Sequence, residues 1–95
     1  MGKDRTLLTL DSDEFTTLIH QSAGLRGRGN FQQAIELVES NLHKLHHDCL
    51  ENAYLELIYA AREGGLPEVA HRYAKLLAGI DPNIPIVKKV LGENS

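Results

Sequence analysis

Apolar residues recur at steps of three and four positions through most of the chain. Such steps place side chains on one face of an α-helix, and no stretch alternates apolar and polar residues as a half-buried strand does. Glycine and proline interrupt the pattern near residues 24–29, 64–67 and 81–85. The pattern therefore predicts an all-α fold of about five helices joined by short turns.

The first two helices have recognisable starts. Asp11 and Glu14 have the spacing of a capping box, so the first helix is expected to begin at Asp11 or the residue after it. Asn30 is a favourable N-cap for the second helix. The apolar face of this second helix is expected to continue through Leu42 to Leu45.

The remaining helices follow from the next two breaks. The third helix is expected to begin near Cys49, and the fourth opens with Pro67, where a missing N–H costs nothing. A short fifth helix is expected from Pro85 to Leu91.

The length of 95 residues suits a single domain. Within it we expect a flexible tail, two helical hairpins and a capping helix, over residues 1–10, 11–47, 49–81 and 84–92 respectively.

The two predicted hairpins repeat each other at an offset of 36 residues. The segment "RGRGNFQQAIEL" (26–37) aligns with "REGGLPEVAHRY" (62–73). The alignment pairs an arginine, a turn glycine and a small alanine, namely Arg26 with Arg62, Gly29 with Gly65, and Ala34 with Ala70. Glycine supplies the positive φ that a tight turn requires, and alanine lets two helices approach closely. Because one hairpin cannot bury both of its faces, the hairpins are expected to stack.

In this repeat the chain resembles the tetratricopeptide repeat (TPR) family. The second copy, counted from Glu51, carries the signature positions at Tyr54, Leu57, Ile58, Gly65, Ala70 and Pro82. The segment "GNFQQAIEL" of the first copy is also similar to the family pattern. The resemblance covers residues 15–92 and is divergent: two repeats plus a short capping helix.

The sequence departs from the family at several positions. The first copy has Leu18, Gln21 and Ser22 at the three signature places of its first helix, and its end lacks proline. The second copy has Ile58 and Pro67 where the family prefers a small residue and an aromatic residue. These departures indicate a divergent relative of the family.

The resemblance implies a non-enzymatic interaction module, either an adaptor, a scaffold or a chaperone-like protein. Such a module would bind a protein partner, as a peptide or a helix, in a concave groove. The groove residues that the resemblance implies are Ile19, Arg26, Asn52, Leu55, Tyr59, Arg62, Ile86 and Lys89. Arginines at its edge would pair with acidic groups of the partner. The alternative is that Ile19 and Leu55 only pack the hairpins together and that the arginines are solvated.

Two repeats make a short array, because about three are usually needed for a stable stack. An apolar strip on such an array is expected to be covered by a partner or by a second copy. The sequence therefore also suggests a homodimer.

Composition narrows the function classes. The net charge of -3 gives no basic face, so nucleic acid is not expected as a partner. No apolar run approaches the roughly 18 residues of a membrane span, so a membrane is not expected as a partner either. One cysteine is compatible with a reducing compartment, so we expect a cytoplasmic protein. No nucleophile elbow or phosphate loop is present, and neither an enzyme activity nor a cofactor is predicted.

The segment "HKLHHDC" (43–49) supports a second hypothesis, a small metal- or pH-responsive protein. Its candidate ligands are His43, His46, His47 and Cys49. If the second helix continues through this segment, His43 lies three and four residues before His46 and His47 and shares one helical face with them. Histidines at that spacing can bind zinc, copper or nickel. However, no second pair of ligands lies nearby in the sequence. Histidines also suit a helix C-terminus in their own right, and Cys49 also suits a small buried position.

Overall fold

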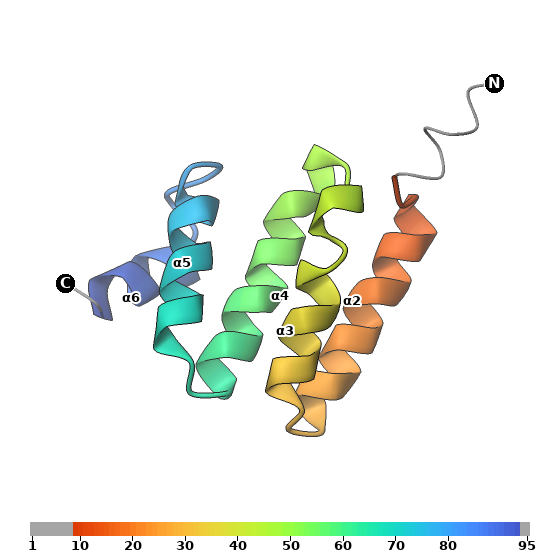
Figure 1. The fold of residues 1–95 in the computed structure, drawn as a ribbon. Helices are drawn as coiled ribbons and strands as arrows, with labels where there is room; N and C mark the ends of the chain where they lie inside the picture. Colours follow the sequence, from red (N-terminus) through yellow and green to blue (C-terminus); the bar gives the residue numbers. More distant parts are fainter. Residues whose placement is uncertain (1–8, 94–95) are drawn as a thin grey trace.

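The computed structural model describes residues 9–93, and this part of the chain contains five α-helices and no strand, which confirms the all-α prediction (Figure 1). The helices are α2 (Ser12–Gly27), α3 (Phe31–Glu39), α4 (Leu50–Glu63), α5 (Pro67–Ala78) and α6 (Pro85–Glu93). Two short 3-10 turns, η1 (Leu42–Lys44) and η2 (His47–Cys49), connect α3 to α4. The predicted tail lies, up to residue 8, outside the described residues.

The helices form a row in chain order. Figure 1 shows α2, α3, α4 and α5 side by side, each roughly antiparallel to the next, with α6 inclined across the far end. Consecutive helices pack against each other, and α2 also packs against α4. This last contact brings together the first helices of the two hairpins, as a stacked array requires.

The two hairpin turns have the same backbone geometry. Gly29 and Gly65 are the described residues with positive φ, at 84° and 71°. The amide of Asn30 donates to the carbonyl of Leu25, and the amide of Leu66 donates to the carbonyl of Ala61, each at 2.8 Å. Ala34 and Ala70, placed alike in the following helices, are 0% and 2% exposed. The offset of 36 residues seen in the sequence is thus a repeat of local structure.

The start of α2 is capped as its sequence predicts. The amide of Glu14 donates to Oδ1 of Asp11 at 2.8 Å, and the amide of Asp11 donates to Oε1 of Glu14 at 2.9 Å. These two bonds satisfy N–H groups that an uncapped helix leaves without partners. The start of α3 differs, because the side chain of Asn30 makes no capping hydrogen bond.

The prediction that the second helix runs to Leu45 is wrong, because α3 ends at Glu39. Beyond it, the Ser40 hydroxyl and the Asn41 side-chain amide both donate to the carbonyl of Leu37, at 3.1 and 2.9 Å. Serine and asparagine compete in this way with the helical hydrogen bonds, which favours a helix end. The leucines that follow still contact the core, from η1 and the residue after it.

A single core runs through all five helices, from Phe15 in α2 to Val90 in α6. At the hairpin turns the packing is close: a Cβ on Gly64 would lie 2.6 Å from the Cβ of Phe31. Among residues 9–93, two polar residues are buried, Ser22 at 0% and Glu56 at 5% exposure. None of the described helices combines the length and the apolar character of a membrane span.

Tyr73 joins the second hairpin to the first. Its ring stacks on Tyr54 with centroids 5.7 Å apart, and its hydroxyl donates to the carboxylate of Glu39 in α3. Burial, and then the hydrogen bond to Glu39, raise the pKa of Tyr73 to about 12. The tyrosine is therefore a neutral donor at any ordinary pH.

Candidate functional site

An open hollow of about 400 Å³ lies between α2 and α4. It is therefore built by the first helix of each hairpin, the helices that the TPR resemblance predicts to line a groove. Its lining combines apolar, polar and charged side chains: Phe15, Thr16, Ile19, His20, Arg26, Asn52, Leu55, Glu56 and Tyr59.

Five of the eight residues predicted for the groove line this hollow. They are Ile19, Arg26, Asn52, Leu55 and Tyr59. The sequence pattern thus brings residues from positions 19 to 59 to one surface. Their role in binding remains a prediction.

The other three predicted residues lie elsewhere. Arg62 is half-buried, forms an ion pair with Glu93 of α6, and lines a separate hollow of about 200 Å³ beside α5 and α6. Ile86 is partly buried against the core, and Lys89 is exposed on α6. Neither is among the residues that line the hollow between α2 and α4.

The wall of the hollow offers apolar surface to solvent. Ile19 and Leu55 are partly buried and touch the core, while Tyr59 is 40% exposed. Among the described residues, the other large hydrophobic side chains with such exposure are Leu76 and Ile80, which lie outside this hollow. Leu76 and Ile80 therefore offer exposed control positions outside the hollow.

The floor of the hollow is an ion pair between the hairpins. Arg26 of α2 donates from Nε to Oε2 of Glu56 in α4 at 3.1 Å and from Nη2 to Oε1 at 3.3 Å. The hydroxyl of Ser22 donates to the same Oε2 at 2.9 Å. Nη1 of Arg26 also pairs with Glu63 at 2.9 Å. Such a two-point contact between guanidinium and carboxylate fixes the orientation of both groups.

This pairing changes the role expected of Arg26. Burial by itself lowers the pKa of Arg26, but the hydrogen bond and charge of Glu56, with the charge of Glu63, outweigh it and raise the pKa. The guanidinium also lies 5.9 Å from the centre of the Tyr59 ring. Because its donors already serve two carboxylates of the same chain, Arg26 does not offer a free charge to an acidic partner.

Ser22 and Glu56, which join Arg26 beneath the hollow, were not predicted from the sequence. A signal was present, because Glu56 stands three residues after Ala53 and four before Ala60, on the apolar face of its helix. A carboxylate on that face needs a partner, since a buried charge without one is costly. Arg26, in the preceding repeat, was the available cation.

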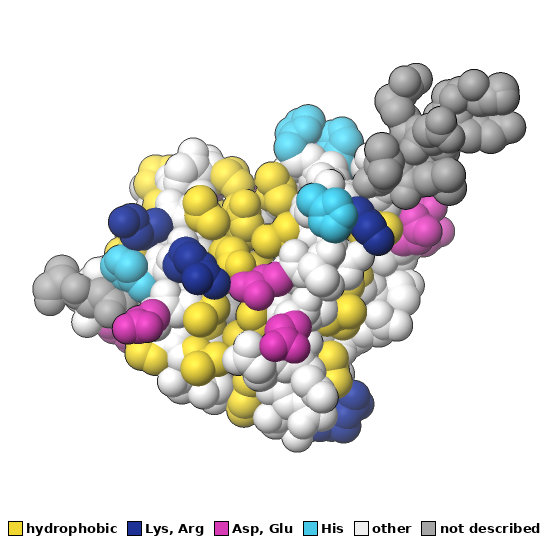
Figure 2. Space-filling model, viewed as in Figure 1, with side chains coloured by type: hydrophobic (Ala, Val, Ile, Leu, Met, Phe, Trp, Pro, Cys, Tyr) yellow, Lys and Arg dark blue, Asp and Glu magenta, His cyan; other side chains and the backbone are white. Residues whose placement is uncertain are grey.

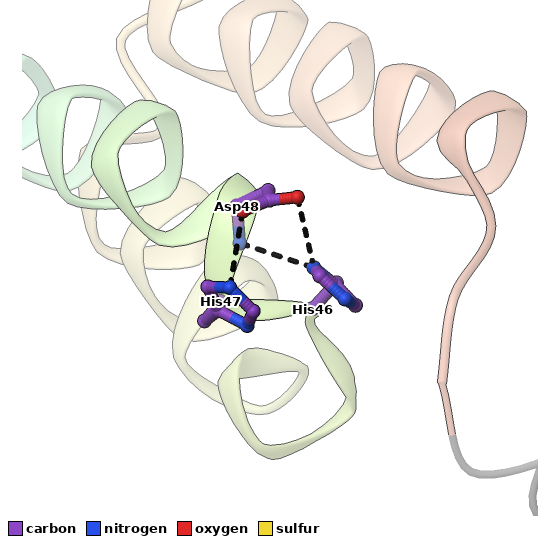
Figure 3. Close-up of side chains that lie close together, drawn as sticks. All are labelled: His46, His47 and Asp48. Carbon is purple, nitrogen blue, oxygen red and sulfur yellow. Dashed lines mark hydrogen bonds and ion pairs between the residues drawn. The ribbon is translucent and has the colours of Figure 1, made fainter.

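The histidine segment forms a second group of polar side chains. In η2 and the residue before it, His46, His47 and Asp48 place one potential ligand atom each within 4.8 Å of one another (Figure 3). All three are exposed, and Figure 2 shows histidine side chains protruding where α3 gives way to α4. Among the described residues this is the one such group of histidine, cysteine and acidic side chains.

The membership of this group differs from the predicted one. His43 and His47 do not share a helical face, because η1 ends at Lys44 and the chain then extends through Leu45 and His46. His43 is exposed outside the group, and partly buried Cys49 packs against the core instead. The predicted set fails here because it assumed a continuous helix.

No protein-family model, curated protein or solved structure matches the chain.

Proposed function

We propose that the chain is a non-enzymatic protein-interaction module, a divergent member of the TPR family, that holds a partner helix or peptide between α2 and α4. One observation carries the proposal: the first helices of both hairpins line one open hollow of about 400 Å³ that exposes apolar surface. Helical repeats use this kind of surface for binding. An adaptor or scaffold requires no more chemistry than this.

The charges of the hollow indicate what it accepts. Arg26 and Glu56 neutralise each other at its floor, so a charged side chain of a partner finds no free counter-ion there. Ile19, Leu55 and Tyr59 favour large apolar side chains instead. An amphipathic helix that presents apolar anchors at helical spacing has this character, and its apolar face is the occupant that we propose.

Site-specific photo-crosslinking tests the proposal. A photoreactive amino acid replaces exposed Asn52 inside the hollow, and in a matched control it replaces exposed Leu76 outside it. In native lysate, a discrete crosslinked partner is expected from position 52 and not from position 76. Crosslinking that is equal at both positions would contradict the assignment of the hollow.

A second substitution, at Tyr59, tests how much the apolar wall contributes to binding. Tyr59→Ala, made in the chain with the photoreactive residue at position 52, is expected to reduce the crosslinked yield strongly, since a buried tyrosine anchor contributes about 2 kcal/mol or more to an interface. A crosslink that joins two copies of the chain identifies the predicted homodimer as the complex. An unchanged yield in the Tyr59→Ala variant would remove the hollow from the binding surface.

A further inference from the structure

The three side chains in Figure 3 place their potential ligand atoms within 4.8 Å of one another. Nδ1 of His46 lies 3.4 Å from Oδ2 of Asp48, and Nε2 of His47 lies 3.2 Å from Oδ1 of the same carboxylate. Zinc binds histidine nitrogen at about 2.0–2.1 Å, so two ligands of a tetrahedral ion lie about 3.3 Å apart. Each imidazole nitrogen lies near this distance from one oxygen of the carboxylate, but the two oxygens differ, so a shared ion would contact both oxygens or would need a small rotation of Asp48.

The remaining separation, between the two imidazoles, can adjust at little cost. The side chains of His46 and His47 are 52% and 80% exposed, so packing restricts a small rotation only weakly. Their rings already face each other with centroids 4.3 Å apart. An ion bound between them would therefore require side-chain rotation and no rearrangement of the helices.

The backbone explains why these residues converge. His46 is extended, with φ −64° and ψ 146°, and η2 begins directly after it. Its Nδ1 accepts a hydrogen bond from the amide of Asp48 at 3.2 Å. A nitrogen that accepts an N–H bears a lone pair and no proton, and such a nitrogen can bind a metal in place of the hydrogen bond. Coordination there would release the Asp48 amide to water, since this residue is exposed.

We propose that His46, His47 and Asp48 bind a divalent transition metal of the class of Zn²⁺, Ni²⁺ and Cu²⁺. Two imidazoles and one carboxylate suit these ions, whereas Mg²⁺ and Ca²⁺ prefer oxygen ligands throughout. Because the group is open to solvent, water completes the coordination. This site goes beyond the proposed peptide binding, since none of its ligands lines the hollow between α2 and α4.

Because the three proposed ligands are consecutive in sequence, the choice of measurement matters. An unfolded chain keeps them close in sequence and retains part of the affinity, so metal adds little to the free energy of unfolding. Thermal stabilisation is therefore a poor readout. Direct binding is the appropriate one.

The test is isothermal titration of the untagged full chain with ZnCl₂ and NiCl₂, with MgCl₂ as the control salt. We expect one metal ion per chain and no heat from Mg²⁺. His46→Ala and His47→Ala should each weaken Zn²⁺ binding at least about tenfold, the lower end of the loss caused by changes around a metal ligand. Asp48→Asn, which keeps size and removes charge, should also weaken it.

His43→Ala is the matched control, because it removes an exposed histidine of the same segment that lies outside the group. It should leave the affinity unchanged. Equal losses in His43→Ala and His47→Ala would overturn the proposed ligand set. An absence of saturable binding up to about 1 mM Zn²⁺, the weak limit of a specific site, would overturn the site itself.

Discussion

Replacement of Arg26 by methionine tests the ion pair beneath the hollow. The substitution keeps much of the aliphatic stem and removes the charge, which leaves Glu56 at 5% exposure without its cation. Removal of one partner of a buried ion pair typically costs about 3–5 kcal/mol. The Arg26 side chain is 23% exposed and the hydroxyl of Ser22 still serves the carboxylate, so we expect the lower end, about 3 kcal/mol.

Urea unfolding followed by circular dichroism measures this loss, provided that the slope of the transition is unchanged. The double variant Arg26→Met, Glu56→Met should recover most of the stability, because an apolar pair of similar volume removes the desolvation cost of both charges. Arg28→Met is the control, since Arg28 is exposed at the same end of α2, and it should change the free energy by less than about 0.5 kcal/mol. A loss of less than about 1 kcal/mol in Arg26→Met, or a double variant less stable than the single one, would refute the reasoning.

Three further predictions concern the array. Asp11→Ala removes the capping box of α2 and should cost about 1 kcal/mol in urea unfolding, whereas Asn30→Ala should cost less because that side chain makes no capping bond. Gly64→Ala should cost about 1–3 kcal/mol because its Cβ collides with α3, while Gly27→Ala meets nothing within 4 Å and should be neutral or stabilising. The folded-state pKa of Tyr73, at about 12, lies above the ordinary value of 10.0. Its contribution to stability is therefore complete below pH 10 and is lost as the pH rises through 12, so Tyr73→Phe should remove the highest step of the tyrosinate absorbance titration. A titration that keeps this step would contradict the assignment.

Local chemistry made most of the helices predictable. The capping box at Asp11, the first-turn proline at Pro67 and the glycines of the two turns each act within a few residues, so sequence spacing reveals them. The end of α3 was not predicted, although its cause is also local. Its apolar spacing continued to Leu45, but the side chains of Ser40 and Asn41 close the helix first. Apolar periodicity alone cannot detect this competition.

The hollow was partly predictable because it depends on the repeat. Once two hairpins stack in register, Ile19 and Leu55 must approach each other, and both line the hollow. The pairing of Arg26 with Glu56 was not predictable in the same way. It depends on how deeply the Glu56 carboxylate is buried between two helices. The alignment of the two repeats predicts which residues lie at equivalent positions, but it does not predict how buried each one is.

The two repeat-related arginines show what this difference means for function. Arg26 reaches from α2 to Glu56 of α4, and Arg62 reaches from α4 to Glu93 of α6. Each therefore ties the first helix of one hairpin to the helix two positions further along the array, which is α4 for α2 and α6 for α4. A guanidinium used in this way ties neighbouring units of the array together and is already paired with a carboxylate of the same chain. Under the proposed function, specificity comes from the shape and apolar character of the hollow, and the ion pair beneath it holds α2 and α4 at their spacing.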